Sequence, residues 1–136
     1  KKDVIAGEQN FKNAIIDGSP GTGCPVIASL TGADYTLIVT EPTVSGVHDL
    51  RRILDVANFF QIKSGIVVNK YDLNPKKTEE IKAIAEEAGS FFLGTIPYDR
   101  SVTEAQVKGL SVVEYTDGNI SEEIKQIWKK IKEQCF

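Results

Sequence analysis

Methionine is absent from this sequence, and cysteine occurs at only two of its 136 positions, Cys24 and Cys135. Two cysteines are too few for a disulfide-stapled scaffold, so a reducing, cytoplasmic location is expected. The chain opens with Lys1 and Lys2 and has no initiator methionine, so we expect that it was processed or cut from something longer. No run approaches the roughly 20 apolar residues of a membrane span and no signal peptide opens the chain, so no membrane association is expected.

A large excess of positive or negative charge is also lacking. The chain has 16 Lys and Arg residues against 19 Asp and Glu residues, which leaves a net charge of −3. It therefore has no basic surplus for a phosphate backbone, and nucleic acid is not expected as a partner. The hydrophobic share of 41% and the charged share of 26% are those of a globular protein and exclude disorder. The length predicts a single domain over residues 1–136.

Strand-like and helix-like segments alternate along the chain. Apolar runs rich in strand formers lie at 13–17, 35–40, 65–69 and 91–96. Helices are expected after an N-cap at Ser45, after Asn74-Pro75, from about Val102 to Gly109, and from Asn119 onward, where several Ile residues and Trp128 would face inward. Continuous apolar strands between amphipathic helices predict an α/β fold with a parallel sheet covered by helices on both faces.

Ligands bind at the carboxyl ends of the strands in such sheets, so the residues that follow each strand are the candidate site. The first run ends in Asp17 and continues into a glycine-rich stretch at 18–23. An apolar run that ends in a carboxylate is a Walker B pattern, which holds Mg²⁺ directly or through water. The glycines would let backbone N–H groups approach a phosphate. The alternative is an ordinary turn in which Asp17 caps the next helix, and it explains the same residues equally well.

The strand at 65–69 ends in Asn69, which opens the segment Asn69-Lys70-Tyr71-Asp72. This segment matches the Asn-Lys-x-Asp pattern that GTPases use to recognise a purine. An Asx turn that leads into the next helix is the alternative. The last strand is followed by Pro97-Tyr98-Asp99, which could form the wall of a base pocket or a simple turn. Each motif is weak alone, but together they place plausible nucleotide contacts at one edge of a parallel sheet.

The segments 15–26, 39–52, 67–72 and 96–99 closely resemble MinD/ParA-type P-loop ATPases, above all the MinD-superfamily ATPases that carry an inserted ferredoxin domain. The resemblance extends from about residue 13 to residue 131 and implies a three-layer P-loop NTPase fold of the SIMIBI type. It also implies ATP and Mg²⁺ as cofactors. By resemblance, Asp17 is the catalytic switch carboxylate and Mg²⁺ contact, Gly21 lies near the γ-phosphate, Asn69 contacts adenine, and Pro97 and Asp99 border the base.

The family's phosphate-binding loop is missing from this sequence, which contains no Gly-x-x-x-x-Gly-Lys-Ser/Thr and no cluster of ferredoxin cysteines. The resemblance therefore implies the C-terminal half of such an ATPase, inactive by itself, that associates with an N-terminal half or as a homodimer. In the family the P-loop strand lies between the strand that ends at Asp17 and the strand that ends near Thr40. Without it, either those two strands pair directly or another chain supplies the missing strand.

Cys24 follows the switch aspartate at a spacing similar to that of a cluster-ligating cysteine in the related nitrogenase iron protein. It is thus a candidate iron–sulfur ligand, and a small residue at a helix start is the alternative. His48 has no partner set at metal-ligand spacing. The last helix carries lysines offset by glutamates, which favours packing on the sheet over membrane binding.

Three classes of function remain open. The first is the nucleotide-binding part of an ATPase, an energy-coupled switch linked to iron–sulfur or metal-cofactor chemistry. The second is a GTPase-like switch, which rests on Asn69, Lys70 and Asp72. The third is a non-catalytic interaction module that retains the fold.

Overall fold

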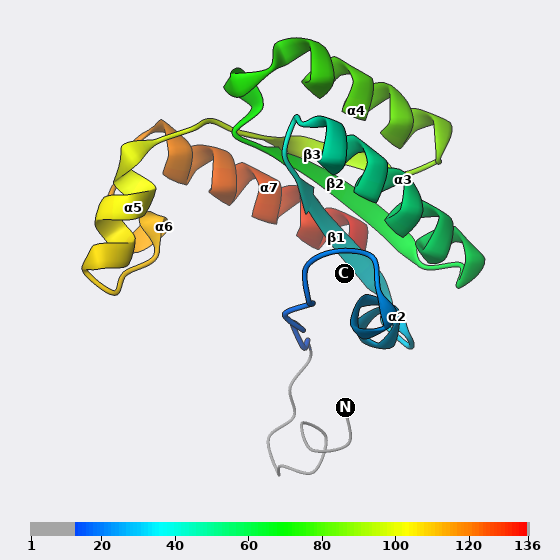
Figure 1. Ribbon diagram of the computed structural model, residues 1–136. Coiled ribbons are helices and arrows are strands. Elements are labelled where there is room, and N and C mark those ends of the chain that lie inside the picture. The colour runs from blue at the N-terminus through cyan, green and yellow to red at the C-terminus, as the bar shows by residue number, and fades with distance from the viewer. Residues whose placement is uncertain (1–12, 136) are drawn as a thin grey trace, which may run out of the picture.

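The computed structural model describes residues 13–135, with a three-stranded sheet between helices (Figure 1). The elements in chain order are α2 (Cys24–Leu30), β1 (Tyr35–Thr40), α3 (Val44–Phe59), β2 (Lys63–Asn69), the 3₁₀ turn η1 (Tyr71–Leu73), α4 (Pro75–Glu87), β3 (Phe91–Ile96), α5 (Arg100–Val107), α6 (Val112–Tyr115) and α7 (Asn119–Cys135).

The sheet is built around β2. Its residues 64–68 are all buried, and β1 and β3 flank it in parallel. The register pairs Thr40 with Val68 and Asn69 with Ile96, so the three strands end at one edge of the sheet. A continuous buried run is expected where helices cover both faces of a parallel sheet. The predicted α/β class is confirmed.

Two hydrophobic clusters hold the layers together, one on each face of the sheet. On one face, α2, α3 and α4 pack against β1 and β2 around Leu50, Ile66 and Ile81. On the other face, the cluster consists of Val67, Leu93, Ile127 and Ile131, which join α7 to β2 and β3. Figure 1 shows α3 and α4 on one side of the sheet and α7 on the other. The predicted three-layer arrangement is therefore confirmed.

The last helix, α7, packs on the sheet as expected, with Ile120, Ile127 and Ile131 buried. The expectation that Trp128 also faces inward is wrong, because 44% of this residue is exposed. Successive helix residues are about 100° apart, so Trp128 lies beside the buried stripe and not within it. Within residues 13–135, no helix has both the length and the apolar character to cross a membrane.

Residues 13–17 do not form the predicted strand. They are irregular and exposed, with Ile15 83% and Ile16 49% exposed. Among the described strands β1 pairs only with β2, and its other edge does not take up this segment. A strand needs a hydrogen-bonded neighbour, and 13–17 has none among the residues that the structure describes. Of the two alternatives for these strands, the structure does not show direct pairing of this run with β1, and Leu37 and Val39 of β1 stay 45% and 58% exposed.

The N-cap of α3 is Thr43, and the expectation of Ser45 is wrong. The Thr43 hydroxyl accepts a hydrogen bond from the backbone N–H of Gly46 at 2.9 Å. That amide is three residues beyond the cap, which is the spacing of a side-chain cap. Ser45 lies inside the first turn instead, with its Oγ 3.2 Å from the Thr43 Oγ1.

The start of α4 was predicted correctly. Asn74 is its N-cap and accepts from the backbone N–H of Lys77 at 3.1 Å, and Pro75 is the first helical residue. Proline suits that position because its missing N–H would have no partner inside the helix. Gly89 adopts a φ of +68° just after the helix, and this left-handed conformation ends it.

Replacing Leu93 by alanine tests whether the face covered by α7 is a real core. Leu93 is only 2% exposed, so Leu93→Ala should lower the free energy of unfolding by about 2–5 kcal/mol. Leu73→Ala is the matched control, because Leu73 is 62% exposed and the loss there should stay below about 0.5 kcal/mol. Urea unfolding followed by circular dichroism measures both. Equal losses in the two variants would contradict the packing described for α7.

Candidate functional site

The parallel strands bring three loops to one edge of the sheet, which we call the carboxyl edge. The last residues of β1, β2 and β3 are Thr40, Asn69 and Ile96, and the register places these strand ends side by side. In open α/β sheets this is the edge where ligands bind, because loops of variable sequence meet there on a rigid support.

Asn69 occupies the centre of the carboxyl edge as the last residue of the central strand. It is half-buried and directly follows the fully buried Val68. Its side-chain amide forms no hydrogen bond with any described residue. An amide carries two donors and an acceptor, so a half-buried one without a protein partner can still bind a polar ligand.

Lys70 follows with a left-handed backbone, at a φ of +53°. This conformation costs a non-glycine residue roughly 1–2 kcal/mol. The Lys70 Nζ lies 2.7 Å from Oε1 of Glu41, in the loop after β1. Both side chains are more than a third exposed, so the ion pair itself adds little stability. Its effect is geometric, because it joins the loops after β1 and β2 at the carboxyl edge.

Asp72 joins the loops after β2 and β3. Its Oδ1 accepts a hydrogen bond from the backbone N–H of Tyr98 at 2.7 Å. A short bond to a charged acceptor is stronger than one between neutral groups. Together with the pair between Glu41 and Lys70, this bond connects all three loops that surround Asn69.

Asp99 is the N-cap of α5, and its carboxylate accepts from the backbone N–H of Ser101 at 2.8 Å. This cap explains why α5 begins at Arg100, so the predicted start near Val102 is wrong. The bond from Ser101 lowers the pKa of Asp99 below its ordinary value. The carboxylate therefore serves the helix, while the half-buried Pro97 ahead of it remains at the carboxyl edge.

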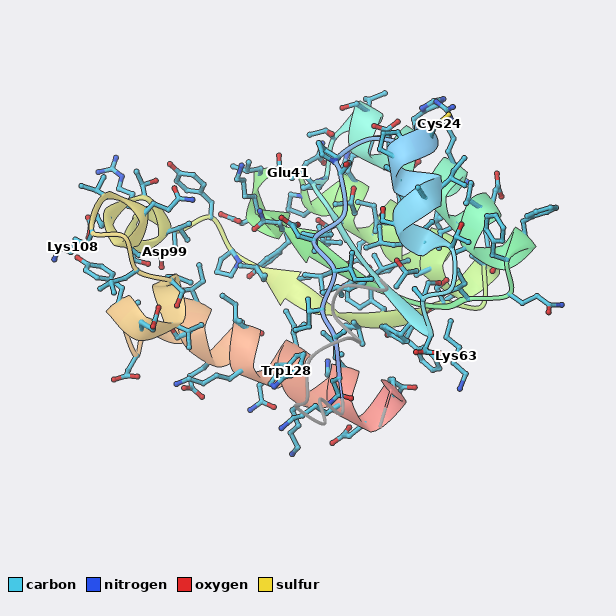
Figure 2. All side chains as sticks on the ribbon, turned by 90° about the horizontal axis from the view of Figure 1, so that it is seen from below. Cys24, Glu41, Lys63, Asp99, Lys108 and Trp128 are labelled. Atoms are coloured by element: carbon cyan, nitrogen blue, oxygen red, sulfur yellow. The ribbon has the colours of Figure 1, made fainter. Side chains whose placement is uncertain are left out.

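The glycine-rich segment at 18–23 and its neighbours Asp17 and Cys24 take no part in these loop contacts. Asp17 is exposed, and its carboxylate has no hydrogen bond or ion pair with any residue in the described part of the chain. Gly21 has a φ of +88° and open space around it. Cys24 is a free, exposed thiol at the start of α2, and Figure 2 shows it well away from Asp99. Residues 13–135 contain no cluster of three or more His, Cys, Asp or Glu residues that could hold a metal.

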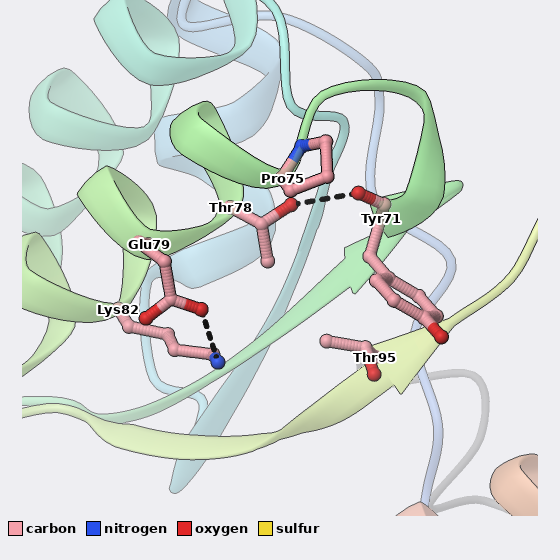
Figure 3. Close-up of a pocket in the computed structure, with 6 residues that line it drawn as sticks. All are labelled: Tyr71, Pro75, Thr78, Glu79, Lys82 and Thr95. Carbon is pink, nitrogen blue, oxygen red and sulfur yellow. Dashed lines mark hydrogen bonds and ion pairs between the residues drawn. The ribbon is translucent and has the colours of Figure 1, made fainter.

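A shallow hollow of about 220 Å³ lies next to the carboxyl edge, between η1, the start of α4 and β3 (Figure 3). It is lined by Tyr71, Pro75, Thr78, Glu79, Lys82 and Thr95. The Nζ of Lys82 pairs with Oε1 of Glu79 at 2.6 Å, and the Thr78 hydroxyl donates to the Tyr71 carbonyl at 3.0 Å. Asn69, Pro97 and Asp99 do not line this hollow, so it is distinct from the base site predicted from the sequence.

The structure thus brings some predicted residues together and leaves others apart. Asn69 and the loop of Pro97 and Asp99 meet at the carboxyl edge through adjacent strands. Sequence reasoning gave no role to Glu41, although it lies in a segment that carries the resemblance. The available signal was an acidic residue at the end of one strand and a lysine at the end of the next, because neighbouring strand ends in a parallel sheet lie close enough to pair.

Comparison with protein families gives a match over most of the chain. The CbiA family model, described as the CobQ/CobB/MinD/ParA nucleotide binding domain, matches residues 3–112.

Individual relatives agree with this match. Two Methanocaldococcus jannaschii proteins, MJ0578 and MJ0579, are 32% and 38% identical over 88% of this chain. The iron-sulfur cluster carrier protein of Methanococcus maripaludis is 32% identical over 97% of it. The chain spans 39%, 41% and 49% of these three relatives, less than half of each.

Solved structures share the fold. The MinD cell division protein of Aquifex aeolicus superposes with a TM-score of 0.78 at 17% identity, and covers 97% of this chain and 58% of that one. MinD of Pyrococcus horikoshii complexed with Mg-ADP has a TM-score of 0.75 at 18% identity, with 95% and 53% coverage. At this low identity the likeness shows a common architecture.

The cap at Asp99 predicts a pH dependence of stability. A carboxylate whose pKa is lowered in the folded state stabilises the fold fully above its unfolded pKa, and this contribution is lost as the pH falls through the folded value. Asp99→Ala should therefore unfold at a lower temperature than the parent at pH 7, and the difference should shrink below about pH 4. Thermal unfolding at pH 7 and pH 3 measures this. Asp55→Ala, at an exposed position on α3, should show no such pH-dependent gap, and an equal gap would refute the cap.

Proposed function

Because the chain belongs to the CobQ/CobB/MinD/ParA family of nucleotide-binding domains, we propose that its carboxyl edge binds the base of an adenine nucleotide. The observation that carries the proposal is the half-buried amide of Asn69, which has no hydrogen-bond partner among the described residues and lies at the centre of that edge. An amide can donate to and accept from the adjacent polar atoms of an adenine edge. Pro97, at the end of the neighbouring strand, would border the ring.

Asp17 would serve the phosphate side of the site. Its carboxylate is exposed and without a protein partner in the described residues, and carboxylate oxygens are preferred ligands of Mg²⁺ and its bound waters. A bound Mg²⁺ neutralises charge on the phosphates in phosphoryl transfer. The relative complexed with Mg-ADP supports this cofactor. The neighbouring Gly21, with its positive φ and open surroundings, would leave room for a phosphate close to the backbone.

The complete activity would be that of a MinD/ParA-like ATPase acting as an energy-coupled switch. This sequence has no Gly-x-x-x-x-Gly-Lys-Ser/Thr loop, so hydrolysis would need that loop from an N-terminal half or from a different chain. The outer edge of β1, which no described strand covers, and the irregular 13–17 segment support a strand missing between them.

A link to iron–sulfur chemistry is supported by the carrier protein that is 32% identical to this chain. The exposed thiol of Cys24 would supply one ligand to a cluster handled as cargo. One thiol does not complete such a site, so further ligands would come from another copy or another chain.

Two other functions remain as alternatives. A GTPase-like switch would use Asn69, Lys70 and Asp72 to read guanine, and a non-catalytic module would bind no nucleotide. Comparing ATP and GTP binding to the full-length protein separates all three.

Asn69→Ala tests the base contact. Losing hydrogen bonds to a buried polar group costs about 1–3 kcal/mol, so the affinity for ATP should fall roughly 5- to 150-fold in the full-length protein. Dependence on Mg²⁺ should persist, because the metal lies on the phosphate side. Asn58→Ala, at an exposed asparagine on α3, is the matched control and should bind normally. Calorimetric titration measures both, and an unchanged dissociation constant for Asn69→Ala would place Asn69 outside the pocket.

Asp17→Asn tests the metal contact. Asparagine keeps the size of the side chain but removes its charge, so turnover of ATP in the full-length protein should fall by about 10²-fold or more. ATP affinity should fall much less, because the phosphate loop provides most of the binding. Asp34→Asn, at an exposed aspartate just before β1, should leave both quantities unchanged. Near-normal turnover in Asp17→Asn would show that the Walker B assignment is wrong.

A further inference from the structure

The turn that carries Asp72 is held in place from the α4 side. The Thr78 hydroxyl, on a residue only 3% exposed, donates to the Tyr71 carbonyl at 3.0 Å (Figure 3), and the Asn74 carbonyl lies 3.2 Å from the same hydroxyl. The backbone N–H of Leu73 bonds to the Lys70 carbonyl at 3.1 Å and closes η1. Asp72 therefore projects from a turn that is fixed to a helix of the core.

The donor to this carboxylate is set by the sequence of the neighbouring loop. Pro97 has no N–H, so Tyr98 is the first residue after β3 whose amide can donate. That amide donates to Asp72 Oδ1 at 2.7 Å. Residues 97–99 belong to no helix or strand, and Asp99 is already committed to capping α5. The bond to Asp72 is thus what ties the start of this loop to the loop that carries Asn69.

A guanine-reading carboxylate has a different task. It must accept from two adjacent N–H groups of the base, which takes both oxygens turned toward the ligand. Here Oδ1 is turned toward the protein's own backbone at Tyr98. Asp72, the last residue of the motif, is therefore already engaged in a hydrogen bond within the protein. This holds although Asn69-Lys70-Tyr71-Asp72 matches the pattern used for guanine.

We propose that Asp72 is a positioning residue that holds the Pro97–Asp99 loop beside Asn69, and that it thereby makes the site selective for adenine over guanine nucleotides. This inference rests on the proposed nucleotide-binding function. Two walls of the base site, Asn69 and Pro97, come from adjacent strands whose ends are already in register. Asp72 fixes the distance between their loops, so that only Asn69 remains to read the base edge.

The test uses two substitutions of Asp72 and one control substitution in the full-length protein, each titrated with two nucleotides. Asp72→Ala removes the acceptor, and ATP affinity should fall about tenfold, as for the loss of one charge-assisted hydrogen bond, with no gain in GTP affinity. Asp72→Asn keeps an oxygen that can accept from Tyr98, so it should retain ATP affinity within about threefold. Asp34→Ala, at an exposed aspartate before β1, should match the parent. Calorimetric titration with MgATP and MgGTP measures all four proteins.

A second measurement reports the bond itself. Hydrogen exchange at the Tyr98 amide should be faster in Asp72→Ala than in the parent and close to the parent in Asp72→Asn. Circular dichroism confirms that each variant is folded before its affinity is interpreted.

The outcomes are distinct. Unchanged ATP affinity in Asp72→Ala, together with weakened affinity in Asn69→Ala, would overturn the role of Asp72 and leave the proposed nucleotide binding intact. A parent protein that prefers GTP and loses that preference in Asp72→Asn would show that Asp72 reads guanine. A parent protein that binds neither nucleotide would overturn the proposed function and this inference with it.

Discussion

The central strand β2 is buried on both faces, and the remaining elements are arranged around that burial. Ile66, Val67 and Val68 are each at most 1% exposed, and removing such side chains from water contributes roughly 1.5–3 kcal/mol each. Adjacent residues of a strand point to opposite faces, so this run requires apolar helices on both sides of the sheet. The α3 and α4 helices meet that need on one face and α7 on the other.

Burial of the strand also positions the candidate site. The buried apolar run of β2 ends at Val68, and Asn69 is the first polar side chain after it, at the carboxyl edge of the sheet. Parallel pairing brings the ends of β1 and β3 to the same place, and two polar contacts then connect the loops, from Lys70 to Glu41 and from the Tyr98 amide to Asp72. The energy of these contacts is small beside that of the core. Their effect is to fix loops that the core alone leaves free.

The outer edge of β1 is one side of the sheet that no described strand covers. β1 has a strand neighbour on one edge only among the described residues, and Leu37 and Val39 remain exposed on a strand that otherwise packs well. The chain matches less than half the length of the curated relatives. The outer edge of β1 and the apolar run at 13–17, which no described strand covers, support the proposal that an N-terminal half supplies a further strand.

The amino-acid sequence by itself determined the α/β class, the three described strands, the cap of α4 at Asn74 and the family, because apolar periodicity and local hydrogen bonding depend on neighbours in the chain. It also placed Asn69 and Pro97 at one edge, since parallel strands leave no other arrangement. Only the tertiary structure decided that 13–17 is not a strand, because a strand forms only against a partner, and that Trp128 is half exposed. Only it decided that Asp99 caps α5 and that Asp72 binds the Tyr98 amide. Those contacts depend on which backbone groups the fold leaves unpaired at the end of each strand, and no spacing along the chain records that.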